Sequence, residues 1–201
     1  MLHLETVHPD TLDLLKRIQA LPILSETRLV GGTALALQLG HRSSIDLDFF
    51  GSWGEANLQS ALELCGTVVR TGGTGRLQFY EVNQIKVDFV TYAYVWLEGA
   101  SLEGGLRLAR VEDIAAMKLE AITNRGSKKD FIDLAFLLET FTLSEMLALY
   151  VAKYPQGSEY LVLRSLVYFD DAEDDPSPVM LKPLGWDEAK ARICDAVRAT
   201  A

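Results

Sequence analysis

The sequence predicts an α/β (α+β) protein whose N-terminal half alternates strands and helices and whose C-terminal half is helical. Apolar residues alternate with polar ones over residues 45–50 and again over 85–89, a period of two that is typical of strands. Residues 9–21 instead carry their apolar side chains on one helical stripe. From residue 112 onward the pattern is mostly helical, which gives the two halves their different character.

The expected elements follow from these periods and from the positions of glycine, proline and turn residues. The N-terminal half reads as a helix over 9–21, a strand over 27–30, a helix over 33–39, a strand over 45–50, a helix over 55–65 and a hairpin of 77–82 with 84–92. Helices are expected over 112–125, 128–138, 142–154, 159–169 and 187–199. The predicted division is a core over residues 1–100 and a helical region over 101–201, packed as one unit with that core.

Composition excludes several classes of protein. No apolar run reaches membrane-spanning length, and the first residues lack the pattern of a signal peptide. Cys65 and Cys194 are isolated and lack metal-binding spacing, which indicates a reducing cytoplasm. The formal net charge of −9 argues against a protein that grips nucleic acid over its whole surface. A polynucleotide partner would have to be engaged through a small site.

Asp46 and Asp48 lie two residues apart, among the apolar residues Ile45, Leu47 and Phe49. In a strand the apolar side chains would share the buried face and both carboxylates the other face. Two carboxylates side by side repel each other, so the pair needs a cation or abundant water. The alternative is an edge strand with two surface acids.

Asp88 is a third strand carboxylate, on the same face as Lys86 and opposite Val87. If its strand pairs near that of Asp46 and Asp48, three carboxylates project from one sheet face. Hard oxygen ligands of this kind suit Mg²⁺, or Mn²⁺, which also binds substrate phosphates. The alternative for Asp88 is an ion pair with a neighbouring lysine or arginine.

The turn Gly31-Gly32-Thr33 follows the first expected strand and opens a helix. Its free backbone N–H groups and hydroxyl could receive a phosphate, and Thr33 could equally cap the helix. Arg42 is a second candidate phosphate contact, with a solvent-exposed loop arginine as the alternative. His41 is read as structural.

Ser44 precedes Asp46 by two residues and would share its strand face. A phosphate on Ser44 would add roughly −1.5 to −2 charge beside the carboxylates. The hypothesis is that such a modification repels a nucleoside triphosphate and switches the protein off.

The helical half contains a second polar pattern. Lys118 and Arg125 lie seven residues apart, hence on one helical face, and Lys129, Asp130 and Asp133 follow in the next helix. Asp130 is expected to orient a basic residue. The alternatives are a surface lysine for Lys118 and an intrahelical ion pair between Lys129 and Asp133.

In this order, the motifs resemble the signature of the DNA polymerase β-like nucleotidyltransferase superfamily and, within it, the AbiEii/AbiGii-type nucleotidyltransferase toxin family. The resemblance covers roughly residues 28 to 138 and continues more loosely into 169–186. The matching stretches are residues 31–37, 40–42, 46–50 and 86–89, followed by Lys118, Arg125, Lys129, Asp130 and Asp133.

The resemblance implies a mixed sheet flanked by helices and a metal-dependent transfer of a nucleoside monophosphate from an NTP to a hydroxyl group. It implies an RNA acceptor, such as the 3′ end of a tRNA, and a toxin controlled by a companion antitoxin. The implied catalytic residues are Asp46, Asp48, Asp88 and Lys118, of which the three aspartates also bind metal. The implied nucleotide contacts are Gly31, Gly32, Thr33, Arg42, Arg125, Lys129 and Asp130.

Other activities compete with this interpretation. The acidic composition would suit a cationic small molecule, as in aminoglycoside-modifying relatives, better than RNA. A protein hydroxyl is another possible acceptor. A domain that binds nucleotide without turnover is the non-enzymatic alternative.

Overall fold

The computed structural model describes residues 1–54 and 57–200, and its chain divides into two compact units. The first unit contains Met1–Ala93 and Ala100–Ala109, and the second contains Tyr94–Gly99 and Arg110–Ala201. The expected border at residue 100 differs from this division in one respect. Residues 100–109 return to the first unit, after residues 94–99 have already entered the second.

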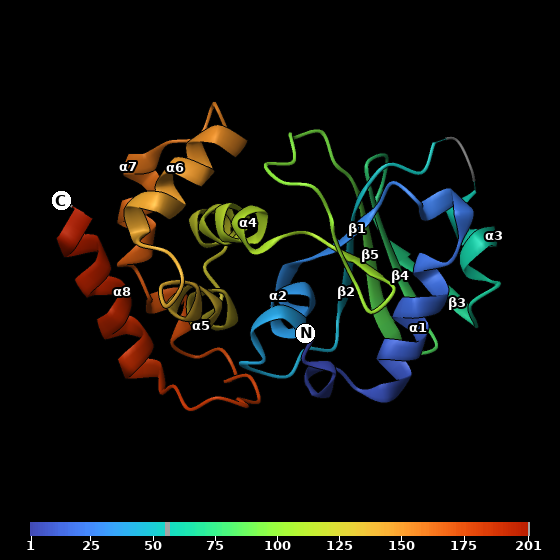
Figure 1. The fold of residues 1–201 in the computed structure, drawn as a ribbon, viewed down its shortest axis with the longest axis horizontal. Coiled ribbons are helices and arrows are strands. Elements are labelled where there is room, and N and C mark those ends of the chain that lie inside the picture. Colours follow the sequence, from blue (N-terminus) through green and yellow to red (C-terminus); the bar gives the residue numbers. More distant parts are fainter. Residues whose placement is uncertain (55–56, 201) are drawn as a thin grey trace. The chain divides into compact units, whose positions relative to one another are not determined.

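The first unit contains a single mixed sheet (Figure 1). Its strands are β1 (Arg28–Val30), β2 (Leu47–Gly51), β3 (Val68–Gly72), β4 (Leu77–Val82), β5 (Ile85–Thr91), β6 (Ser101–Glu103) and β7 (Leu106–Leu108). The strand order is β3-β4-β5-β2-β1-β7-β6. β2 pairs with β5 in parallel and with β1 antiparallel, so the expected carboxylate strand lies inside the sheet. The predicted fold class is confirmed.

The helices of this unit are α1 (Pro9–Gln19), α2 (Gly31–Leu39) and α3 (Leu58–Leu62), with 3₁₀ turns at Leu4–Thr6 and Pro22–Leu24. α2 packs on β1 and β2, and α1 contacts β7. The helix expected over 55–65 is observed only as α3. Its predicted first residues, Glu55 and Ala56, lie outside the described part of the chain.

The apolar residues of β2 and β5 form the centre of the core on one face of the sheet. Phe49 and Phe89 are register partners, are fully buried and stack with ring centroids 5.1 Å apart. The alternation predicted for these strands is therefore confirmed from Leu47 onward. Ile45 is a correction: it was expected on the buried face but is exposed, because β2 begins only at Leu47.

The second unit is helical (Figure 1). Its helices are α4 (Val111–Asn124), α5 (Lys128–Leu137), α6 (Leu143–Lys153), α7 (Glu159–Leu166) and α8 (Trp186–Thr200), with a 3₁₀ turn at Asp170–Ala172. α4 packs against α5, α6 and α7, and α8 contacts α5, α6 and α7. None of the helices in the described residues has the length and apolarity needed to cross a bilayer.

A buried ion pair explains why residues 94–99 belong to the helical unit. Lys153 and Asp113 are both fully buried, with 2.5 Å between Nζ and Oδ1. Lys153 also donates to the Val95 carbonyl, while Asp113 accepts the backbone N–H groups of Leu97 and Glu98. Each charge is thus paired and hydrogen-bonded, as burial requires.

Candidate functional site

The sheet register brings Asp48 and Asp88 together. They are direct partners across the parallel strands β2 and β5, so both side chains leave the same face of the sheet. Asp46 lies in the link just before β2. Since β2 is an interior strand, the alternative of an edge strand with two surface acids is wrong.

Lys86 supplies a cation on this face. Its Nζ lies 2.9 Å from Oδ2 of Asp88, so the ion pair considered as an alternative for Asp88 does exist. Partial burial lowers the pKa of Lys86, but the hydrogen bond to Asp88 and the charges of Asp88, Asp46 and Asp48 outweigh it. The pKa of Lys86 is therefore raised, which indicates that the field of all three carboxylates reaches its ammonium.

The donor chemistry of these residues fits a divalent cation. Oδ1 of Asp88 is buried and has no hydrogen-bond partner, although a buried carboxylate oxygen normally has one. Carboxylate oxygens are the ligands that Mg²⁺ and Mn²⁺ prefer. Among residues 1–54 and 57–200, no three His, Cys, Asp or Glu side chains already stand at metal-binding spacing. Asp48 and Asp88 are therefore suited to a cation by side-chain type and shared strand face, and Asp46 by type, while the Lys86 ammonium binds Asp88.

The glycine turn lies against the same carboxylates. Gly31 begins α2 with a φ of +66°, and a Cβ placed there would lie 2.6 Å from Oδ2 of Asp48. A Cβ on Gly32 would lie 2.3 Å from Nη2 of Arg42. Both glycines are needed for close approach, one beside an acid and the other beside a base. The main-chain N–H groups of this first helical turn have no acceptor within the helix, which is the usual basis of phosphate binding.

Gly31→Ala is expected to destabilise the protein by about 1 to 2 kcal/mol, because alanine is strained at positive φ and its methyl group displaces Asp48. Urea unfolding would measure this loss. Gly75→Ala is the matched control for strain alone, since Gly75 also has positive φ but a Cβ there meets no atom within 4 Å. An equal loss in both variants would show that the contact with Asp48 contributes nothing.

The side chains of Thr33 and Arg42 hydrogen-bond to residues of the link that precedes β2. The Thr33 hydroxyl is buried, lies 2.8 Å from Oγ of Ser44 and donates to the main-chain carbonyl of Asp46. Thr33 therefore positions the residue before Leu47, and a phosphate contact there would come from its main chain. Arg42 is buried and donates to the Ser43 carbonyl, so the alternative of a solvent-exposed loop arginine is wrong.

Ser44 is only partly exposed. Its N–H donates to the Thr6 carbonyl, and it forms an isolated bridge with Val7. The proposed phosphorylation of Ser44 stays a prediction, and a phosphate would have to break the contact with Thr33.

In the second unit, Lys118 is buried rather than a surface lysine. Its Nζ lies 2.8 Å from Oδ1 of Asp130 and 2.6 Å from Oδ2 of Asp133. Asp133 thus pairs with Lys118 on the neighbouring helix. Lys129, considered as its intrahelical partner, is exposed at the start of α5.

Asp130 collects several donors, as expected of a residue that orients basic side chains. Besides Lys118 it accepts the Ser127 hydroxyl at 2.6 Å and Nε of Arg125 at 3.1 Å. Burial raises the pKa of Asp130, but the charges of Lys118 and Arg125 and their hydrogen bonds dominate and hold it well below its usual range. Lys118, Arg125, Asp130 and Asp133, called here the Lys118 cluster, balance to zero net charge.

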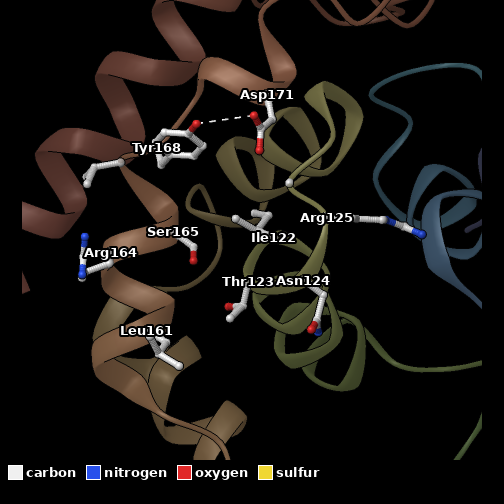
Figure 2. A pocket seen from close by; sticks show the side chains of 11 residues that line it. Ile122, Thr123, Asn124, Arg125, Leu161, Arg164, Ser165, Tyr168 and Asp171 are labelled. Carbon is white, nitrogen blue, oxygen red and sulfur yellow. Dashed lines mark hydrogen bonds between the residues drawn. The ribbon is translucent and has the colours of Figure 1, made fainter.

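The helical unit also contains a pocket of about 480 Å³ at the C-terminal end of α4. Figure 2 shows Leu161 and Ser165 of α7 facing Ile122 and Thr123, while the Arg125 side chain extends away from them. Lys118, Asp130 and Asp133 do not line it. Arg125 is therefore the expected site residue among those that line the pocket. Its guanidinium group, however, pairs with Asp130 of the Lys118 cluster.

One contributor to these arrangements was missed in the sequence, the hydroxyl of Ser127. Ser127 was not predicted to contact Asp130, although a serine three residues before an aspartate at a helix start can bond to that side chain.

Comparison with known proteins gives a consistent result. The model of the family described as "Nucleotidyl transferase AbiEii toxin, Type IV TA system" matches residues 13–199. An uncharacterised protein of Aquifex aeolicus (strain VF5) is 34% identical over 169 residues, which cover 80% of this chain and 82% of that protein.

Three solved structures share the fold. JHP933 from Helicobacter pylori has a TM-score of 0.59 at 18% identity, over 94% of this chain and 88% of that chain. A structure described as a putative nucleotidyltransferase from H. pylori has a TM-score of 0.60 at 18% identity, over 94% and 91%. The nucleotidyltransferase toxin MenT4 from Mycobacterium tuberculosis H37Rv has a TM-score of 0.56 at 17% identity, over 94% and 84%.

Proposed function

Because the chain belongs to the AbiEii nucleotidyltransferase toxin family, we propose that it transfers a nucleoside monophosphate from an NTP to the terminal hydroxyl of an RNA, in a metal-dependent reaction. The observation that carries this proposal is the register of β2 and β5. It sets Asp48 directly opposite Asp88, beside a glycine turn that opens a helix. Carboxylates next to a phosphate-binding turn are what phosphoryl-type transfer requires.

Asp46, Asp48 and Asp88 would hold Mg²⁺ or Mn²⁺. The bound cation would supply Lewis-acid chemistry, polarising phosphate oxygens and lowering the pKa of the acceptor hydroxyl. The protein's own contribution is to fix the carboxylates. Thr33 holds the Asp46 main chain, and Gly31 leaves the space that Asp48 occupies.

The phosphates of the NTP would bind at the first turn of α2. Its main-chain N–H groups and the positive end of the helix dipole both favour an anion there. Arg42, packed over Gly32, adds positive charge to the same turn. The parts that Lys118, Arg125, Lys129 and Asp130 take in nucleotide binding remain predictions from the sequence.

The acceptor is proposed to be an RNA 3′ end, such as that of a tRNA, which a toxin would inactivate in the cytoplasm. The net charge of −9 supports contact with the end alone, because a long RNA track along an acidic surface would be repelled. The family description names a toxin–antitoxin system, and we extend this to a cognate antitoxin for this chain.

Transfer of label from α-³²P-labelled NTPs tests the proposal. The protein would be incubated with Mg²⁺ or Mn²⁺ and with total tRNA, lysate protein or aminoglycosides in separate reactions. We expect label on RNA alone, and none on tRNA whose 3′ diol was first oxidised with periodate.

Each other outcome identifies a different function. Label on aminoglycosides would favour a cationic small-molecule substrate, which an acidic protein attracts. Label on protein would favour modification of a protein hydroxyl. A cellular phenotype unchanged in Asp46→Ala and Asp48→Ala variants would favour a nucleotide-binding module without turnover.

A further inference from the structure

Lys86 already occupies a coordinating atom of the proposed metal site. Its ammonium binds Oδ2 of Asp88 at 2.9 Å, from two residues earlier on the same strand face. The Asp88 side chain is only 13% exposed, whereas that of Lys86 is 58% exposed. The acid is therefore held in place by the sheet, while the base can swing into water on its flexible stem.

One carboxylate oxygen cannot fully serve an ammonium and a divalent cation at the same time. Two cations within a few ångströms repel each other, and the repulsion grows as water leaves the site. Oδ1 of Asp88 is buried without a hydrogen bond, so Lys86 satisfies just one side of this carboxylate. The Lys86 ammonium therefore balances the charge of Asp88 but leaves one oxygen of that carboxylate without a hydrogen-bond partner.

We propose that Lys86 is a resident counter-ion of the three carboxylates, which neutralises Asp88 in the metal-free protein and leaves it when a divalent cation binds. This inference rests on the proposed function, because it needs the aspartates to bind metal. Lys86 acts through Asp88 and is a positioning residue. It sets how much free metal is required before the carboxylates are loaded.

The sheet offers Lys86 a second partner when it leaves. Glu81 on β4 is its direct register partner across the antiparallel pair of β4 and β5, so both side chains lie on one face. Glu81 is exposed and lies away from Asp48, whose neighbours are on β1 and β5. A displaced ammonium thus keeps a carboxylate within reach, which lowers the cost of moving it.

The test measures binding of Mn²⁺ alone to the full chain, by calorimetric titration without nucleotide. Lys86→Met removes the charge but keeps the length, and we expect it to bind Mn²⁺ about tenfold more tightly. Lys16→Met removes one charge from an exposed position of the same unit and should change affinity less than about twofold. Glu81→Gln should weaken Mn²⁺ binding by about two- to threefold, because the displaced lysine loses its second partner.

Thermal unfolding provides a readout that needs no activity. In chelator, Lys86→Met should melt a few degrees below the wild type, because Asp88 then loses its ion pair with the Lys86 ammonium. Mn²⁺ should raise its melting temperature more than that of the wild type, since the tighter complex stabilises more.

Three results would overturn the inference. If wild type and Lys86→Met bind Mn²⁺ equally, and Asp48→Asn abolishes binding in both, the metal site stands and the role of Lys86 is wrong. If neither protein binds Mn²⁺, both the proposed metal-dependent function and the inference about Lys86 are wrong. Weaker binding in Lys86→Met would also overturn it, because Lys86 would then support the cation rather than compete with it.

Discussion

Asp48→Asn is expected to lower nucleotidyl transfer by at least about a thousandfold while the protein stays folded. Asn preserves the size of the side chain beside Gly31 but removes the charge that a divalent cation requires. Because Asp48 lies opposite Asp88, the substitution also removes a repulsion within the sheet. The melting temperature in chelator should therefore equal or exceed that of the wild type.

Asp13→Asn is the matched control, an exposed aspartate on α1 of the same unit. It should retain wild-type transfer. An Asp48→Asn protein that still transfers nucleotide at the wild-type rate would show that Asp48 binds no essential cation, and the proposed mechanism would be wrong. Loss of activity together with a collapsed melting transition would instead assign Asp48 a structural role.

Lys118→Met is expected to destabilise the helical unit by about 3 to 5 kcal/mol. Asp130 and Asp133 would remain buried after losing the ammonium that both of them contact, and the Arg125 side chain that pairs with Asp130 is 64% exposed. Chemical unfolding followed by circular dichroism would measure the loss. Lys182→Met, at an exposed position of the same unit, should stay within about 0.5 kcal/mol of the wild type.

The destabilisation should also depend on pH in a defined direction. The folded-state pKa of Asp130 lies below its ordinary value of about 3.9, so the wild type has this contribution at neutral pH and loses it as pH falls below about 4. In Lys118→Met the ammonium no longer lowers that pKa, and burial raises it. The gap in unfolding free energy should therefore narrow as pH falls from 7 towards 4. A constant gap would mean that lost packing, and not charge, causes the destabilisation.

The sequence predicted the central strands well because, in a strand with one buried and one polar face, apolar and polar residues alternate with a period of two. Leu47, Phe49, Val87 and Phe89 face the core as expected, and Asp48 and Asp88 share the other face. That these aspartates are register partners could not follow from the sequence. The parallel pairing of β2 with β5 joins segments that are far apart in the sequence, and the residue pattern of neither strand specifies its partner.

The strands β3, β6 and β7 were missed, and two of them, β3 and β6, lie at the edges of the sheet. β3 exposes most of its residues, and β6 and β7 have three residues each, too few to show a clear apolar alternation. Lys118 was open to two interpretations for a related reason. A lysine on an apolar helix is buried only if another element supplies carboxylates to pair with it. In this protein α5 supplies them, as Asp130 and Asp133.

The return of residues 100–109 to the first unit makes that unit discontinuous along the chain. β7 pairs with β1 in parallel through Leu29 and Leu108, so a stop codon after residue 93 would remove the strand that covers one side of β1. The glycine turn follows directly from β1. A prematurely terminated polypeptide would therefore expose an unpaired strand edge, a template for aggregation, next to the turn on which phosphate binding depends.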